Sequence, residues 1–318
     1  MTSVYELSTR GGLRPTSSSE LPPKGVKDGV LRWVRMVGPQ PHELQAGFRA
    51  LELPDADLET LCGGDVSSRV ASHGLGLVMT LPVVAPGEGR AWVLRVACTP
   101  TTLITAEDQA LPAIDRVVTE GSSAERSELT LPGLLLKVID AAAGSAGPLY
   151  LSLRRELEAL ADAVESNPRE VPPDALLAMR SQVARLSMLW EDQIHGFMEL
   201  KRCHAFIPVS GGPQDLLRDL VSEGGRGLKL LAQMETRLRD LRQHQQQFLQ
   251  ESTNRRLNML AILSSIYMPA TLIAGIYGMN FNHIPITTLS HGYFVVMGFM
   301  AIVVLGHFWY FYRRGWFK

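Results

Sequence analysis

The chain has 318 residues, with 31 Lys or Arg against 32 Asp or Glu, which gives a formal net charge of −1. Because there is no broad basic excess, nucleic acid is excluded as a default partner. The three cysteines, Cys62, Cys98 and Cys203, lie far apart without a CxxC pair, which argues against a disulfide framework or a zinc knuckle and favours a reducing compartment.

Residues 1–30 contain no apolar run of the kind found in signal peptides. Residues 15–29 are polar and rich in Pro and Ser. We therefore predict that residues 1–30 form a disordered lead.

Residues 31–130 contain short runs rich in Val, Leu and Thr, separated by Gly and Pro. Such runs are typical of strands in a mainly antiparallel sheet. We expect strands at residues 31–37, 74–84, 91–99 and 103–106, and helices near residues 42–51 and 55–62. The stretch is therefore predicted to be an α+β domain.

Residues 131–256 show helical periodicity and are predicted to be a helical region. We expect helices at residues 131–143, 148–166 and 173–202. No proline occurs from Gln214 until Pro269, so one helix over residues 214–275 would be on the order of 90 Å long.

An apolar seam within this long helix predicts coiled-coil-like packing against copies of the chain. Its positions alternate by three and four: Leu231, Met234, Leu238, Leu241, Gln245 and Phe248. Gly224, Gly225 and Gly227 precede the seam, and each Gly costs about 1 kcal/mol relative to Ala in a helix. They indicate either a bend or hinge, or a break between two helices.

From Leu257 to Tyr312 the chain contains no Asp, Glu, Lys or Arg. This stretch predicts two transmembrane helices, residues 257–276 and 291–312, each long enough to cross ~30 Å of hydrocarbon. A polar loop, residues 277–290, joins them, and residues 313–318 form a basic tail. Arg and Lys flank the two spans but are missing from the loop, so we expect both termini in the cytoplasm and the loop outside.

The first span carries a small or polar stripe, which we call the α-stripe, on one face of the helix. Its positions also alternate by three and four: Asn254, Leu257, Ala261, Ser264, Met268, Thr271, Gly275 and Gly278. The pattern alone favours helix packing and pore lining equally. Since one hairpin cannot enclose an aqueous path, a pore would require a homo-oligomer with closed symmetry.

Residues 267–281, which read YMPATLIAGIYGMNF, closely resemble the signature of the CorA family of divalent-metal transporters. The basic, aromatic tail resembles that family as well, and weaker similarity upstream includes Asp140 and Asp219. The resemblance implies a funnel-shaped homopentamer in the cytoplasmic membrane, with an α/β cytoplasmic domain followed by long helices. It implies that the first spans line the pore and the second spans form an outer ring.

The resemblance implies that Gly278, Met279 and Asn280 form the ion-selective outer mouth, with Asn280 in a ring of amides. The expected pore-lining residues, running inward from Gly275, are Gly275, Thr271, Met268, Ser264, Ala261, Leu260, Leu257 and Asn254. Leu260 is the position that matches the family, whereas Ala261 fits the spacing of the α-stripe better.

The transported ion is predicted to be a divalent cation, and membrane lipid is the other expected partner. Mg²⁺ usually keeps several waters, and a ring of Asn280 oxygens can accept hydrogen bonds from that hydration shell. Mg²⁺ uptake driven by the membrane potential is therefore our leading prediction, with Co²⁺ and Ni²⁺ as further cargoes. No cofactor is expected, and no phosphate-binding loop with the required Lys is present.

A Zn²⁺ transporter resembling the ZntB branch, with or without coupling to protons, is the alternative within the family. The loop after Asn280 has no acidic residue, and this neutrality is similar to that branch. His283 offers a nitrogen ligand suited to Zn²⁺, although a single loop His is more often an ordinary polar residue. A membrane-anchored scaffold without transport is the alternative from another class, and no constellation of residues predicts an enzyme.

The resemblance also places Asp219 where the family has an aspartate of an inter-subunit metal site that holds the channel closed. The partner position in the N-terminal domain aligns with Thr60, which has Glu59 beside it and Asp65 nearby. The alternative for Asp219 is an ordinary solvated helix residue.

Overall fold

The computed structural model describes residues 1–8, 12–16, 30–64, 66–73, 76–84, 91–123, 130–203, 212–279 and 291–315. The chain divides into two compact units, Met1–Arg242 and Gln243–Lys318. Helix α7 (Gly212–Tyr277) contributes residues to both units. The first unit contains the sheet, and the second contains the end of α7 and helix α8 (Gly292–Arg313).

Within the described residues, seven strands form one sheet in the order β2-β1-β3-β7-β6-β5-β4. The strands are β1 (Thr2–Ser8), β2 (Gly12–Thr16), β3 (Leu31–Val37), β4 (Arg69–His73), β5 (Gly76–Val84), β6 (Ala91–Cys98) and β7 (Thr102–Glu107). Neighbouring strands are antiparallel except β3 and β7, which are parallel. The predicted mainly antiparallel sheet is confirmed.

The prediction of a disordered lead was wrong for residues 2–8 and 12–16, because these residues are β1 and β2. Strand β1 pairs with β3 in the register Tyr5 to Trp33, and the two rings lie 5.4 Å apart. Leu7 and Leu13 are buried in the core. Val4 and Tyr5 of β1 are residue types that favour strands, but the Pro- and Ser-rich residues that follow obscured this signal.

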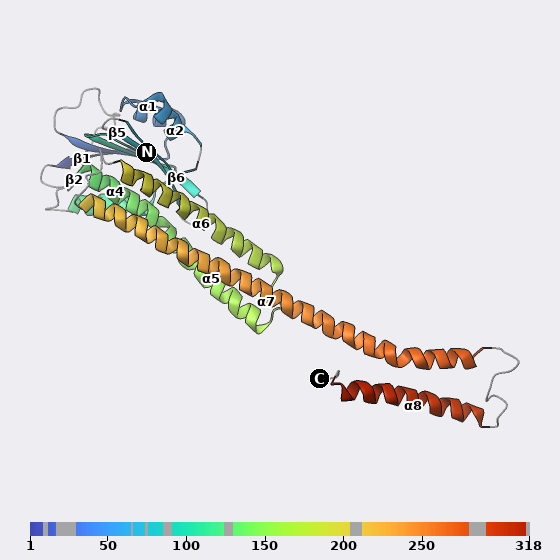
Figure 1. The fold of residues 1–318 in the computed structure, drawn as a ribbon. Helices are drawn as coiled ribbons and strands as arrows, with labels where there is room; N and C mark the ends of the chain where they lie inside the picture. Colours follow the sequence, from blue (N-terminus) through green and yellow to red (C-terminus); the bar gives the residue numbers. More distant parts are fainter. Residues whose placement is uncertain are drawn as a thin grey trace. The chain divides into compact units, whose positions relative to one another are not determined.

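The remaining helices of the described residues are α1 (Pro41–Arg49), α2 (Asp55–Cys62), α3 (Pro112–Ser123), α4 (Leu131–Ala143), α5 (Gly147–Ser166) and α6 (Pro173–Arg202). The predicted helices at residues 131–143 and 173–202 are confirmed, whereas α3 and strand β4 were missed. Thr130 fixes the start of α4, because its hydroxyl oxygen accepts a hydrogen bond of 3.2 Å from the Gly133 N–H. Helices α1 and α2 lie on one face of the sheet, and α4 lies on the other (Figure 1).

Helices α5, α6 and α7 pack together beyond the sheet around a second apolar cluster. Four seam residues of α7 are buried in that cluster: Leu231, Met234, Leu238 and Leu241. The prediction that this part of the seam packs against copies of the chain was therefore wrong. A period of three and four marks an apolar face, but it does not say whether the partner helix belongs to the same chain.

Gly224 and Gly227 lie where α7 touches α6. A Cβ atom at Gly224 would lie 2.6 Å from Ile194, and a Cβ at Gly227 would lie 2.5 Å from the ring of Trp190. A Cβ at Gly225 would meet nothing within 4 Å. Helix α7 continues through all three glycines, so of the two alternatives the break between two helices is wrong, and two of the glycines allow close helix packing.

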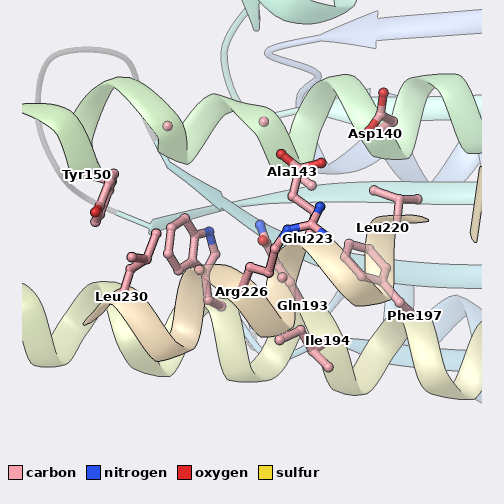
Figure 2. A pocket seen from close by; sticks show the side chains of 15 residues that line it. Asp140, Ala143, Tyr150, Gln193, Ile194, Phe197, Leu220, Glu223, Arg226 and Leu230 are labelled. Carbon is pink, nitrogen blue, oxygen red and sulfur yellow. The ribbon is translucent and has the colours of Figure 1, made fainter. Parts of the chain in front are cut away.

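A pocket of about 370 Å³ lies beside this contact, lined by residues of α4, α5, α6 and α7 (Figure 2). Ile194 and Phe197 of α6 are buried, whereas Glu223 and Arg226 of α7 are exposed. The pocket therefore has an apolar base and a charged rim.

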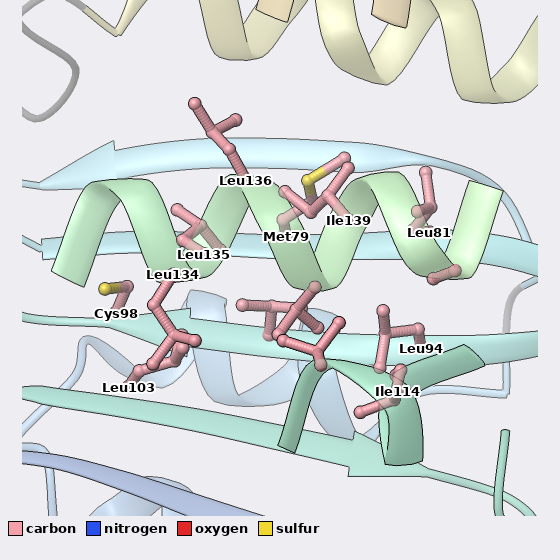
Figure 3. Packing of buried hydrophobic residues seen from close by; sticks show 14 of the residues in the cluster. Met79, Leu81, Leu94, Cys98, Leu103, Ile114, Leu134, Leu135, Leu136 and Ile139 are labelled. Atoms are coloured by element: carbon pink, nitrogen blue, oxygen red, sulfur yellow. The ribbon is translucent and has the colours of Figure 1, made fainter. Parts of the chain in front are cut away.

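The main core lies between the sheet and α4 (Figure 3). Leu134, Leu135 and Ile139 of α4 are fully buried, as are Leu94 and Leu103 of the sheet. Alternation along the strands divides the apolar side chains between this core and a smaller one under α1 and α2.

A buried ion pair joins the parallel strands to helix α3. Arg35 of β3 holds Glu107 of β7 in a bidentate pair of 2.5 and 2.9 Å, and its third nitrogen lies 2.5 Å from Asp115 of α3. Glu107 also accepts a hydrogen bond of 2.9 Å from the Leu111 N–H. Every oxygen of this buried carboxylate is therefore matched by a donor.

The contrast between the glycines predicts opposite effects of one substitution. Gly227→Ala is expected to lower the stability of the protein by roughly 1–3 kcal/mol, because the new Cβ displaces the Trp190 ring. Gly225→Ala, the matched control, is expected to leave stability unchanged or to raise it by up to about 1 kcal/mol. Thermal unfolding of the purified full-length protein measures both. An equal melting temperature for the two variants would contradict the packing role of Gly227.

Candidate functional site

By length and composition, three helical stretches of the described residues are able to cross a membrane: Leu131–Ser166, α7 and α8. The first of these belongs to the soluble cores, since side chains of α4 and α5 fill both large clusters. Helix α8 and the end of α7 instead expose nearly all of their large apolar side chains. These are the two helices that the charge-free stretch predicted.

The membrane part of α7 has one protected face. Its less exposed residues recur every three or four positions: Ile262, Ser265, Ile266, Pro269, Ala270, Ile273 and Tyr277. At 3.6 residues per turn these positions lie on the side of the helix opposite the α-stripe.

Helix α8 has a matching protected face, with the less exposed residues Gly292, Val296, Met300, Val303, Val304, His307 and Phe311. A cavity of about 490 Å³ lies between the two helices, with Tyr277 on one side and Val296 and Met300 on the other. The hairpin therefore closes through the face of α7 that lies opposite the α-stripe. Packing within the hairpin does not account for the α-stripe.

The α-stripe and the neighbouring Leu260 are exposed along their whole length in the single chain. Leu257, Leu260 and Met268 expose 57, 59 and 73% of their surface, and Asn254, Ala261, Ser264, Thr271 and Gly275 are also exposed. Ser264, Met268, Thr271, Gly275 and Met279 line one shallow groove along this face. The structure therefore brings most of the predicted pore-lining residues together on one open surface.

Thr271 has a hydroxyl group with a fixed direction. It donates a hydrogen bond of 2.8 Å to the carbonyl oxygen of Tyr267, one turn earlier. Because the only hydroxyl proton is used, the oxygen can offer only lone pairs to the groove. A hydrogen-bond acceptor of this kind suits the hydration shell of a cation.

Gly278 and Met279 directly follow Tyr277, the last residue of α7. The Gly278 N–H donates to the Ala274 carbonyl oxygen at 2.9 Å, and the Met279 N–H donates to Ile276 at 3.3 Å. A Cβ at position 278 would lie 3.0 Å from that same Ala274 oxygen, a tight contact that favours glycine there. The predicted residues Asn280 and His283 lie outside the described residues.

The predicted regulatory residues do not form a site within one chain. Glu59 is exposed on α2, which covers one face of the sheet, whereas Asp219 is exposed on the part of α7 whose neighbours Leu217 and Leu220 pack on the other face. Asp65 lies outside the described residues, and among those residues no group of three or more His, Cys, Asp or Glu is placed to hold a metal ion. A site shared by Asp219 and Glu59 would have to join two chains.

Sequence reasoning missed one histidine in α8 and one pair of carboxylates beside a pocket. His307 lies on the protected face of α8, with Nδ1 2.9 Å from the Val303 carbonyl oxygen. Asp140 and Glu223, which are far apart in sequence, line the pocket between α4, α6 and α7. Burial and the nearby Glu223 carboxylate raise the pKa of Asp140. The only sequence signal was an aspartate that follows an apolar run in α4.

Comparison with known proteins agrees with this arrangement. The profile of a family described as CorA-like Mg²⁺ transporter protein matches residues 28–313. The zinc transport protein ZntB of Pectobacterium atrosepticum is 23% identical over 322 residues, which cover 98% of this chain and 95% of that protein. The magnesium transport protein CorA of Pasteurella multocida is 33% identical over 103 residues, which cover 32% of this chain and 31% of that protein.

The fold has a solved counterpart. The complete structure of the CorA magnesium transporter from Methanocaldococcus jannaschii superposes with a TM-score of 0.81 at 18% identity. The match covers 99% of this chain and 98% of that one. At this identity, the likeness shows that the two chains share a full-length fold.

Proposed function

Because the chain belongs to the CorA-like Mg²⁺ transporter family, we propose that it is a Mg²⁺ uptake channel whose pore is lined by the α-stripe. The chain is a divalent cation transporter of this family and an integral membrane protein with C-terminal membrane helices. The observation that carries the proposal is the open face of α7. It lies opposite the contact with α8 and leads to Gly278 and Met279.

The proposed assembly is a homopentamer in the cytoplasmic membrane, with both termini in the cytoplasm. A single hairpin cannot surround water, so several copies must place their α-stripes around one axis. Arg255 and Arg256 precede the first span and Arg313 and Arg314 end the second, which supports a cytoplasmic position for all four. The membrane potential then favours inward movement by about 2.3 kcal/mol per charge per 100 mV.

The chemistry of the described groove supports Mg²⁺ as the cargo. Thr271, Ser264 and Tyr267 offer hydroxyl oxygens, and the remaining groove residues are apolar or small. Mg²⁺ retains its water and needs only such oxygen acceptors, whereas Zn²⁺ prefers imidazole and thiolate ligands. Met268 and Leu257 form apolar constrictions in this assembly, which gate by excluding water.

Zn²⁺ is the second candidate. It is favoured by the similarity to ZntB, which extends over 98% of the chain, and by the neutral loop with His283. Under this alternative His283 supplies a nitrogen ligand at the outer mouth and import is coupled to protons.

We predict that liposomes containing the purified protein take up Mg²⁺ when the interior is made negative. Fluorescent indicators for Mg²⁺ and Zn²⁺ in parallel samples distinguish the two cargoes. Zn²⁺ uptake without Mg²⁺ uptake, in particular if it requires a pH gradient, would overturn the first assignment and support the second.

Asn280→Ala is expected to lower uptake at least about tenfold, because each subunit loses an amide that meets the hydrated ion. Asn258→Ala provides a matched control, since Asn258 lies on α7 outside the α-stripe. Both variants are compared at equal amounts of assembled protein, measured by oligomer mass in detergent. Undiminished uptake by an assembled Asn280→Ala protein would remove Asn280 from the pore.

Two adjacent serines test which face of α7 is accessible to water. Ser264 lies on the α-stripe, and Ser265 lies on the face toward α8. In a protein with Cys62, Cys98 and Cys203 replaced by alanine, Ser264→Cys is expected to react with a charged, water-soluble thiol reagent at least about tenfold faster than Ser265→Cys. Its modification should also block uptake. Equal reaction rates would contradict the assignment of the α-stripe to a pore.

A further inference from the structure

Tyr267 lies in the middle of the first membrane span. In a span of residues 257–276 it is roughly 15 Å from either end, at 1.5 Å per residue. The other tyrosines of the hairpin lie near the ends of its two helices: Tyr277, Tyr293, Tyr310 and Tyr312. Tyrosines at such ends meet the lipid headgroups and water. Among the described residues of the hairpin, Tyr267 alone carries a phenol hydroxyl too deep for that contact.

The hydroxyl of Tyr267 has no hydrogen-bond partner among the described residues. The side chain exposes 65% of its surface in the single chain. Hydrocarbon tails neither donate nor accept hydrogen bonds, so a hydroxyl that faces them is left unsatisfied at a cost. The side of α7 that carries Tyr267 must therefore meet water or another copy of the chain.

Tyr267 lies on the side of α7 that the proposed pore uses. Four positions recur there at intervals of seven, four and seven residues: Leu260, Tyr267, Thr271 and Gly278. At 3.6 residues per turn these positions share one side of the helix. Tyr267 also lines the shallow groove together with Ser264 and Thr271. Its backbone carbonyl oxygen accepts the hydroxyl proton of Thr271 at 2.8 Å. Tyr267 and the acceptor oxygen of Thr271 thus belong to one surface.

We propose that Tyr267 lines the passage and forms, with Ser264 and Thr271 of the same chain, a band of hydroxyl groups at the middle of the membrane. The inference rests on the proposed pore and adds a residue to it. The middle of the membrane is where a cation is farthest from bulk water, and Mg²⁺ gives up its waters reluctantly. Hydroxyl groups hold those waters without the strong binding of a carboxylate.

The band has a defined relation to the apolar constriction at Met268. Ser264 lies about one turn before Met268, Thr271 lies about one turn after it, and Tyr267 directly precedes it in the sequence. An apolar constriction conducts only when water enters it. Hydroxyl groups on both sides keep water next to Met268, so a small widening of the passage is enough to fill it.

The first test measures the accessibility of position 267 in liposomes, using the full-length protein whose native cysteines are replaced by alanine. Tyr267→Cys is expected to react with a charged, water-soluble thiol reagent within about threefold of the rate of Ser264→Cys, because access limits the reaction. It should react at least about tenfold faster than Ile266→Cys, the matched control on the face toward α8. A rate as low as that of Ile266→Cys would overturn the proposal.

The second test removes only the hydroxyl group. Tyr267→Phe is expected to slow Mg²⁺ uptake at least about threefold, at an unchanged oligomer mass and melting temperature. Tyr293→Phe makes the same change on α8, where the side chain is 71% exposed, and should leave uptake unchanged. Undiminished uptake by Tyr267→Phe would overturn the proposal. A loss of oligomer mass would also overturn it and assign the hydroxyl to the contact between copies.

The two tests separate this inference from the proposed function, because the thiol reaction requires no ion flux. A protein that reacts rapidly at position 267 but carries no Mg²⁺ would overturn the proposed cargo and support the water-filled face. A protein that carries Mg²⁺ but protects position 267 would overturn the role of Tyr267 alone.

Discussion

Helix α7 can approach α6 as closely as it does only because Gly224 and Gly227 carry no side chain. The same approach sets the rotation of α7, so that its apolar seam is buried against α5 and α6. The pocket between α4, α5, α6 and α7 lies beside this contact, and Gly224 and Gly227 form part of its lining. This close contact adjoins both the second core and the pocket.

Helices and strands could be predicted from the sequence where their apolar periodicity and at least one boundary residue lie within a short stretch. Helix α4 lies between Thr130 and Gly144, helix α6 begins at Pro173, and strand β3 is followed by Gly38. Strands β1 and β2 were missed because their few apolar side chains form part of the core only when β1 is paired with β3. The α-stripe was predicted from its spacing, but the face that meets α8 became evident only from burial. Asp140 and Glu223 could not be paired, because nothing in a sequence relates positions so far apart.

The membrane hairpin contains no acidic side chain in its two spans. The last carboxylate before it belongs to Glu251, which pairs with Arg255 at 2.8 Å, and none follows. A carboxylate within the hydrocarbon region is costly and would hold a divalent ion too tightly for rapid release. Oriented dipoles such as the Thr271 hydroxyl avoid both costs. Between Leu257 and Tyr312 the chain offers weak acceptors such as this hydroxyl and no charged side chain.

The two opposite faces of α7 also have different genetic consequences in the proposed assembly. The α-stripe of each chain contributes to a passage that all copies share. One defective copy, altered for instance at Met268, therefore obstructs an assembly whose other members are intact, and the defect is dominant. The face toward α8 serves only its own hairpin, so a weak substitution at Ile273 remains confined to one member and is masked by the wild-type copies. The set of dominant substitutions therefore identifies the face of α7 that lines the shared passage.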